Sequence, residues 1–368
     1  MACNLINLTL LSSQLTRNYQ IDAFNIVLYK VSDVLCKSFV MINEKESLHA
    51  IQILDPDLEI IDAHHHLWDL PGSRYLFDEL LADLNSGHRI EATVYVECSA
   101  MYRSQGPEEL KVLGEAEFVA GMAAMSNSGL YGPTKICAAF VGAADLTLGS
   151  EVDAVLDGLA ACSGQRLRGI RSSAIWDADP SVNTGTRPFA SKGILSSSIF
   201  RRGFERLAAK ELSYDAWQYH PQTPEVISLA KAFPNTPIII NHVGGLLGIG
   251  PYAKPDLFQN WKTLTLEASE IPNIYMKLGG LAAKRCGFDY GTEPTETQLV
   301  RAWSPYIKTC IDLFGPERCL FQTNFPPDKV AGSYSKIWNV FKRIAADYSP
   351  SEKKSLFNTT AKKLYKIK

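Results

Sequence analysis

The sequence predicts an α/β protein whose main domain is a (β/α)8, or TIM, barrel. Eight short apolar segments recur from residue 58 onward, and stretches with helical periodicity separate them. The chain has 368 residues, of which 46% are hydrophobic, so it can bury a large core. Alternating strands and helices indicate a parallel sheet, and eight such units favour a closed barrel over an open sheet.

The sequence divides into an N-terminal extension and the barrel. Residues 1–55 mix apolar and polar side chains without a clear period, and we expect an N-terminal extension of uncertain structure there. Residues 56–368 form the predicted barrel. The eight predicted strands span residues 58–63, 92–97, 136–141, 167–172, 213–219, 237–242, 273–278 and 318–323. No GxGxxG motif follows the first strand, so a dinucleotide site has no support.

Amphipathic patterns between these strands predict the helices. They span residues 108–124, 151–161, 204–212, 225–233, 305–314 and 334–348. The segment 172–199 is a long polar loop, and loops of this length often serve as a lid or a substrate wall. The lysine-rich residues 353–368 predict a solvated terminal helix.

Composition excludes several classes of function. The formal net charge is -2, from 37 basic and 39 acidic residues, which gives no case for a nucleic acid or an anionic membrane as partner. No apolar run reaches transmembrane length, and no secretory signal precedes the barrel. The eight cysteines are scattered without a CxxC pair, which indicates a reducing compartment. We therefore expect a cytoplasmic protein whose partner is a small molecule.

The segment Asp62-Ala63-His64-His65-His66 follows the first apolar strand. Because a strand alternates its faces, His64 and His66 should point the same way and His65 the other way. Two imidazoles on one face can hold a metal ion or an anionic substrate. The alternative is a set of structural histidines near a strand end.

Further polar residues fall where predicted strands end, which in a barrel is the side that carries the chemistry. Four of the seven histidines belong to this set, and we expect them to converge on one mouth. The residues are His64, His66, Glu97, Arg171, His220, His242, Lys277 and Asn324.

These motifs together resemble the amidohydrolase superfamily, in its amidohydrolase-2 branch, over about residues 58–365. That branch includes lactone hydrolases for sugar acids and pyrone dicarboxylate, as well as aromatic-acid decarboxylases. The motifs are Asp62 to His66, Gly169-Ile170-Arg171, His220, Asn241-His242-Val243-Gly244, Met276-Lys277-Leu278-Gly279-Gly280, Phe314-Gly315-Pro316-Glu317-Arg318 and Asn324-Phe325-Pro326. A homodimer is compatible with this resemblance.

The chain departs from the family at the end of the eighth strand. The family usually has an Asp there, which binds metal and accepts a proton, whereas this chain has Asn324. An amide is not a base at ordinary pH and is an uncharged ligand. We expect Asp328, Glu97 or His242 to take over the proton transfer; the alternative is a site without catalysis.

The same departure leaves two hypotheses for the cofactor. His64 and His66 with His220 or His242 could bind one zinc or manganese ion and leave a position open for water. Without the acidic ligand, the resemblance also permits a metal-free lactonase, in which histidines polarise the substrate carbonyl.

Five residues are candidates for substrate binding. Arg171 could hold a carboxylate in a bidentate fork, or form a structural ion pair. Lys277 is a charge in an apolar strand, so we expect it to face the mouth or a carboxylate. Tyr102 and Arg103 in the second loop, and Trp68 after the histidine cluster, could line the pocket.

The expected function is hydrolysis of a lactone or related cyclic ester that carries a carboxylate or several hydroxyls, by attack of water on the carbonyl. The first alternative is a metal-dependent decarboxylase of an aromatic or enoic acid. The second is a binding protein that keeps the pocket without catalysis.

Overall fold

Eight strands of the described residues form one parallel sheet that curls into a barrel. The computed structural model describes residues 52–185, 187–291 and 293–368, and residues 53–368 make one compact unit. The strands pair in chain order: β1 (Ile60–His65), β4 (Ile90–Val96), β5 (Lys135–Ala143), β6 (Leu167–Arg171), β7 (Ser213–Ala216), β8 (Ile238–Ile240), β9 (Ile274–Leu278) and β10 (Cys319–Phe321). The predicted (β/α)8 barrel is therefore confirmed.

The barrel closes between its last and first strands. A parallel bridge joins His65 to Phe325, the His66 N–H donates to the Phe325 carbonyl at 2.8 Å, and the Asn324 N–H donates to the His64 carbonyl at 2.9 Å. The closure lies at the carboxyl ends of both strands, so it brings the histidine cluster beside Asn324.

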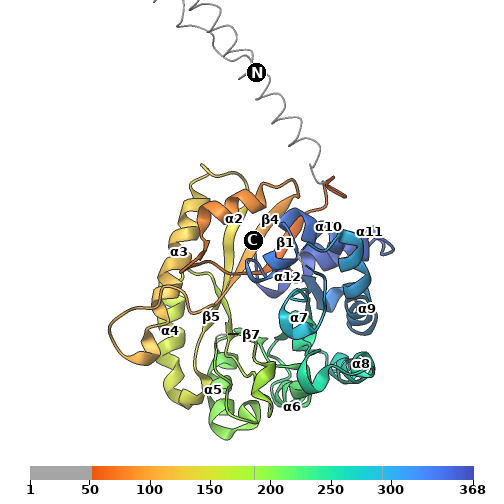
Figure 1. The fold of residues 1–368 in the computed structure, drawn as a ribbon. Coiled ribbons are helices and arrows are strands. Elements are labelled where there is room, and N and C mark those ends of the chain that lie inside the picture. The colour runs from red at the N-terminus through yellow and green to blue at the C-terminus, as the bar shows by residue number, and fades with distance from the viewer. Residues whose placement is uncertain (1–51, 186, 292) are drawn as a thin grey trace, which may run out of the picture. The chain divides into compact units, whose positions relative to one another are not determined.

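The helices surround the strands in chain order (Figure 1), from α2 (orange) through α5 (green) to α9 and α10 (blue). Their bounds are α2 (Phe77–Leu84), α3 (Leu113–Asn127), α4 (Val152–Cys162), α5 (Ser198–Ala209), α6 (Thr223–Ala232), α7 (His242–Gly245), α8 (Leu257–Ser269), α9 (Glu296–Phe314), α10 (Tyr334–Ile344), α11 (Pro350–Lys354) and α12 (Thr360–Leu364). A short antiparallel hairpin, β2 (Trp68–Leu70) and β3 (Ser73–Tyr75), follows β1.

Two apolar cores hold this arrangement together. One lies between the strands and the surrounding helices and includes Phe140, Tyr214 and Trp338. The other fills the barrel interior with small and branched side chains such as Val94 and Ile239. Such interior layers make the barrel a packed core and confine chemistry to its rim.

The C-terminal segment corrects one prediction. Four lysines of this segment, Lys354, Lys363, Lys366 and Lys368, are exposed, but Phe357, Ala361, Tyr365 and Ile367 are buried. Tyr365 and Ile367 belong to the core inside the barrel, so this segment is a structural part of the barrel and is not merely a solvated helix.

Three further findings concern membrane spans, the cysteines and the N-terminal extension. No helix of the described residues is long and apolar enough to cross a membrane. The six cysteines in the described part of the chain are all free. The predicted extension, residues 1–55, lies almost wholly outside the described residues.

Candidate active site

At the end of β1, the side chains of His64 and His66 lie together and that of His65 points the other way, as predicted. The Nε2 atoms of His64 and His66 lie 3.1 Å apart. His65 points away from them, and its Nε2 lies 4.0 Å from the Cys137 sulfur. The register of β1 against β4 shifts between Asp62 and His65, and this irregularity helps to set which side chains face the rim.

His242 joins this cluster from the end of β8. Its ring centroid is 4.7 Å from that of His64, and its Nδ1 lies 2.6 Å from the Gln322 side-chain nitrogen. The backbone of His242 has a left-handed φ of 53°, a strained conformation of the kind that persists at functional sites. Gly280 packs on the ring so closely that a Cβ there would lie 2.2 Å from Nδ1, so only glycine fits.

His220 does not join the cluster, which corrects the prediction that four imidazoles converge. The predicted strand ran to residue 219, but β7 ends at Ala216. His220 instead begins a short 3-10 turn, where its Nδ1 accepts a hydrogen bond from the Leu247 N–H at 3.2 Å and its ring contacts Tyr252. Burial lowers its pKa to about 4.

Hydrogen bonds determine which nitrogens of His64 and His66 carry protons. His66 donates from Nδ1 to the Val96 carbonyl at 2.7 Å, so its Nε2 is an acceptor. The Lys277 ammonium lies 3.4 Å from Nδ1 of His64, and the acceptor Nε2 of His66 lies 3.1 Å from Nε2 of His64. Both contacts favour the His64 tautomer with its proton on Nε2, although the Arg171 NH1 donor lies 3.4 Å from the same atom. Burial is the largest cause that lowers the pKa of both rings, and Lys277 adds to it for His64, so both rings are neutral.

Lys277 is held by a buried carboxylate that sequence reasoning missed. Its Nζ donates to Asp215 Oδ1 at 2.5 Å, and both side chains are fully buried. Asn241 and Tyr365 also donate to Asp215, at 3.0 Å and at 3.1–3.2 Å. Asp215 is also a charged residue within a buried strand, β7, so the reasoning that identified Lys277 could have identified Asp215 as its partner.

Glu97 is clamped between two arginines. Arg171 donates from Nε to Oε1 at 2.6 Å, and Arg187 donates to both carboxylate oxygens at 2.8 and 2.6 Å. These two cations outweigh the effect of burial and lower the pKa of Glu97 to about 2. So weak a base is a poor proton acceptor, which argues against the predicted role of Glu97 in proton transfer. The NH1 group of Arg171 remains beside His64 Nε2, at 3.4 Å.

Asn324 and Asp328 form a pair at the end of β10. The Asn324 amide donates to Asp328 Oδ1 at 2.8 Å, and the Ala282 N–H donates to Oδ2 at 3.4 Å. Burial raises the pKa of Asp328 to about 6, so the carboxylate is ionised at neutral pH and close to accepting a proton. As predicted for a loop that folds back, Asp328 lies next to the residue that replaces the family's Asp.

Of the remaining candidates for substrate binding, Trp68 and Tyr102 lie near the site and Arg103 does not. Trp68 stacks on His66 with ring centroids 6.0 Å apart. Tyr102 lines a cavity of about 430 Å³ together with Glu97. Arg103 does not face the site: its side chain is exposed and pairs with Glu117 on α3, because the loop turns its guanidinium outward.

A second cavity, of about 600 Å³, lies beside the cluster and contains residues that sequence reasoning did not find. Arg285 lines it, and its guanidinium lies 4.7 Å above the Trp217 ring, which in turn contacts His242. The buried Nε of Arg285 has no hydrogen-bond partner among the described residues. Arg187 lines both cavities.

The described residues do not fit a divalent metal ion well. A metal needs the Nε2 lone pair of His64, but Lys277 at Nδ1 places the proton on Nε2. The nearby charges, Lys277 and Arg171, are positive, and the family's acidic ligand is replaced by Asn324. Within the described ranges, no group of three or more His, Cys, Asp or Glu side chains is arranged to hold a metal ion.

Comparisons with known proteins agree with the fold. An uncharacterised protein, y4mH, of Sinorhizobium fredii is 29% identical over 84% of this chain and 99% of its own length. An L-fucono-1,5-lactonase of Burkholderia ambifaria is 22% identical over 83% of this chain and 95% of its own. A zinc-bound amidohydrolase structure from Burkholderia multivorans superposes with a TM-score of 0.65 at 22% identity and covers 84% of this chain and 99% of that one.

The family comparison covers nearly the whole barrel. The model described as "Amidohydrolase" matches residues 61–367, which include every strand of the barrel except the first residue of β1. The chain belongs to the amidohydrolase family, in its amidohydrolase-2 branch.

Proposed function

We propose that the protein hydrolyses a lactone that carries a carboxylate, by attack of water on the ring carbonyl. The observation that carries the proposal is the convergence of neutral imidazoles, the Arg171 guanidinium and the buried Asp328 carboxylate at the carboxyl end of the barrel. The similarity to the L-fucono-1,5-lactonase of Burkholderia ambifaria supports the same reaction class.

Two N–H donors would polarise the carbonyl. Arg171 uses Nε and NH2 on Glu97 and leaves NH1 facing the imidazoles. His242 accepts at Nδ1 from the Gln322 amide, so its Nε2 carries a proton that it can donate. Donors held in place before the reaction stabilise the negative charge that develops on the carbonyl oxygen.

Asp328 would accept the proton of the attacking water. Its pKa of about 6 suits a base that works near neutral pH. As the tetrahedral intermediate collapses, the bond from the carbonyl carbon to the ring oxygen breaks and Asp328 returns the proton to that oxygen. The product is the open hydroxy acid. Asn324 would hold Asp328 in position with its amide.

Two arginines at the cavity favour an anionic substrate. Arg285 has an unpartnered Nε and lies within a cavity large enough for a small ring. A substrate carboxylate would satisfy that donor, and Arg187 borders the same space.

A substrate panel tests the proposal. We would compare a carboxylate-bearing lactone, a neutral sugar-acid lactone and a hydroxybenzoate, and measure acid release and carbon dioxide release. We expect acid release from the carboxylate-bearing lactone, with a KM that rises about 10–100-fold in Arg285→Gln while the neutral lactone is unaffected. Carbon dioxide release alone would support the decarboxylase instead, and no turnover would support a binding protein.

The metal-free mechanism has its own test. Protein treated with a chelator should retain lactonase activity and contain no stoichiometric metal, because His64 offers no lone pair at Nε2. Loss of activity that zinc or manganese restores would overturn this part of the proposal.

A further inference from the structure

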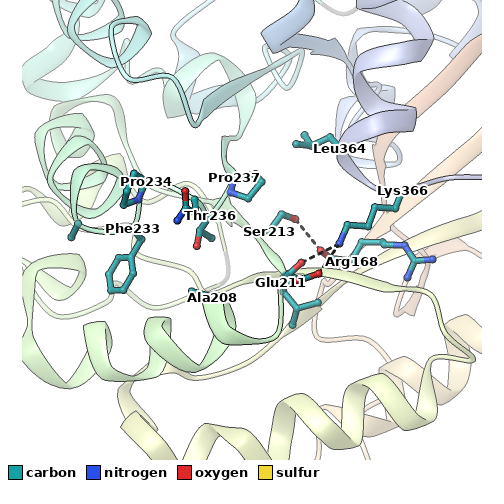
Figure 2. Close-up of a pocket in the computed structure, with 13 residues that line it drawn as sticks. Arg168, Ala208, Glu211, Ser213, Phe233, Pro234, Thr236, Pro237, Leu364 and Lys366 are labelled. Carbon is teal, nitrogen blue, oxygen red and sulfur yellow. Dashed lines mark hydrogen bonds and ion pairs between the residues drawn. The ribbon is translucent and has the colours of Figure 1, made fainter.

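Two adjoining cavities lie at the end of the barrel opposite the active site, where the strands begin. Figure 2 shows one of them, of about 620 Å³, with Arg168 and Lys366 in its wall. The same two residues also line the other cavity, of about 320 Å³, which is bounded by the start of β5, the start of β6 and the C-terminal residues. No residue of the proposed catalytic site lines either cavity.

The smaller cavity, called the basic cavity below, is lined by five cationic side chains and, among the described residues, by no Asp or Glu. The cations are Lys135, Arg166, Arg168, Lys366 and Lys368. In the whole chain 37 basic residues are balanced by 39 acidic ones, so this local excess of positive charge departs from the average composition. Cations gathered in one hollow attract an anion, which would relieve their mutual repulsion.

Backbone carbonyls hold the two arginines of the basic cavity in place. Arg166 donates to the Gly164 carbonyl at 2.9 Å, and Arg168 donates to the Gln165 and Leu167 carbonyls at 2.8 and 2.9 Å. Neither guanidinium forms an ion pair with a described residue. The carbonyls therefore orient the two groups and leave their charges without a counterion.

Arg168 is the clearest sign of an uncompensated charge. Its Nε is buried and has no hydrogen-bond partner in the described part of the chain. Burial, and secondly the charge of Arg166, lower the pKa of Arg168 below its usual value, and no carboxylate offsets them. A bound anion would stabilise the charged guanidinium against both effects.

The lysines of the basic cavity are free to move toward a ligand. Lys135, Lys366 and Lys368 are exposed. Lys366 lies 3.9 Å from the Glu211 carboxylate, but both side chains of this pair are more than half exposed, so the pair is weak. Flexible ammonium groups around two fixed guanidinium groups suit a ligand with several negatively charged oxygens.

We propose that the basic cavity binds a small phosphate-bearing molecule at a site separate from the active site. Arginine and lysine together are common partners of phosphate oxygens. A hollow of about 320 Å³ has the size of a small-molecule site, which a nucleic acid or a membrane surface does not require. No aromatic side chain of the described residues lines it, so a nucleobase would find nothing to stack on. The ligand therefore carries its phosphates on a non-aromatic frame.

Titration calorimetry with inorganic pyrophosphate tests the proposal, with citrate for comparison. We expect pyrophosphate to bind in low-salt buffer, and its Kd to rise as salt is added. The Kd should rise about tenfold in Arg166→Gln, which loses one charge-assisted contact. Lys368→Gln should weaken binding as well, and its exposed position makes a folding defect an inadequate explanation.

Arg301→Gln is the matched control. It removes the same charge from an exposed position on α9 that lines neither cavity, so pyrophosphate should bind to it as to the wild type. The arginines of the active-site rim can also attract an anion, and Arg285→Gln separates the two places. Binding that persists in Arg285→Gln and weakens in Arg166→Gln and Lys368→Gln supports the proposal.

Three results would overturn the basic cavity as a phosphate site. They are the absence of pyrophosphate binding, binding that only Arg285→Gln removes, and an equal loss in Arg166→Gln and Arg301→Gln. Tighter binding of citrate than of pyrophosphate would overturn the assignment to phosphate. The titration needs no turnover, so its outcome is independent of the proposed function.

Discussion

At the scale of single residues, Asp328 carries the proton transfer of the proposed reaction. Asp328→Asn keeps the size of the side chain and removes the base, so we expect kcat to fall about 10²–10⁴-fold. In the wild type, activity should decline as the pH drops through about 6, because Asp328 must be ionised to accept a proton. The pH dependence of kcat measures both effects, and the variant should lack the acidic decline.

Asn324→Asp separates this mechanism from that of a decayed metal site. Two carboxylates would then meet where the amide now donates to Asp328 at 2.8 Å, and like charges at that distance do not both ionise. The acidic decline of kcat should move to higher pH and kcat should fall near neutrality. If the variant instead gains one equivalent of metal together with higher activity, Asp328 is not the native base.

The sequence pointed to most of the residues that meet at the rim, but not to their partners. His64, His66, His242, Arg171, Lys277 and Asn324 could be found because each ends an apolar strand. Arg187 and Arg285 could not, because Arg187 lies in an irregular loop and Arg285 in a short 3-10 turn between β9 and α9, and no periodicity predicts the path of either segment. His220 was misplaced for a related reason: a strand's last residue is the least certain part of its prediction.

At the scale of secondary-structure elements, all eight barrel strands were predictable, because buried parallel strands are nearly continuous apolar runs. The hairpin β2–β3 and helix α8 were not, whereas helix α2 was overlooked although its buried Phe77, Leu80 and Leu84 follow a clear helical period. The hairpin strands are short and partly exposed, and α8 mixes polar and apolar residues around most of its surface. Such elements form through contacts with the barrel and carry a weak signal of their own.

The loop between β6 and α5 contributes residues to the lining of both cavities at the rim. It was predicted as a lid or substrate wall, and Arg187 ties it to the buried Glu97. Arg187→Gln breaks the ion pair, so the loop should become more sensitive to limited proteolysis and the KM for a carboxylate-bearing lactone should rise about tenfold.

Arg206→Gln is the control for that loop, because Arg206 is an arginine of α5 that pairs with Asp153 of α4 and makes no contact with the loop. Both measured quantities should match the wild type in this variant. An equal rise in KM for Arg187→Gln and Arg206→Gln would contradict the assigned role of the loop.

At the scale of the whole molecule, buried titratable groups make the fold sensitive to acid. All six histidines of the described part have lowered pKa values, chiefly through burial, so below about pH 6.5 they take up protons only on unfolding. Asp62, Asp328 and Glu115, with raised pKa values of about 6, 6 and 7, oppose this effect. The histidines outnumber them, so the free energy of unfolding should fall between about pH 6.5 and pH 5.

His65→Gln measures the contribution of one histidine to the pH dependence of the free energy of unfolding. The ring lies on the side of β1 that faces away from the active site, and burial lowers its pKa to about 3. Removing it should reduce the slope of unfolding free energy against pH by about 1.4 kcal/mol per pH unit in that interval, as followed by urea denaturation. An unchanged slope would show that His65 titrates alike in both states.

The closure between β10 and β1 has a consequence for how the protein responds to heat. Its bridge and its two backbone hydrogen bonds involve residues 64–66 and 324–325, which also carry the imidazoles and the amide of the rim. Local fraying of this seam separates the catalytic groups while the other strand pairs stay intact. Warming should therefore inactivate the enzyme reversibly at temperatures where most of its secondary structure survives.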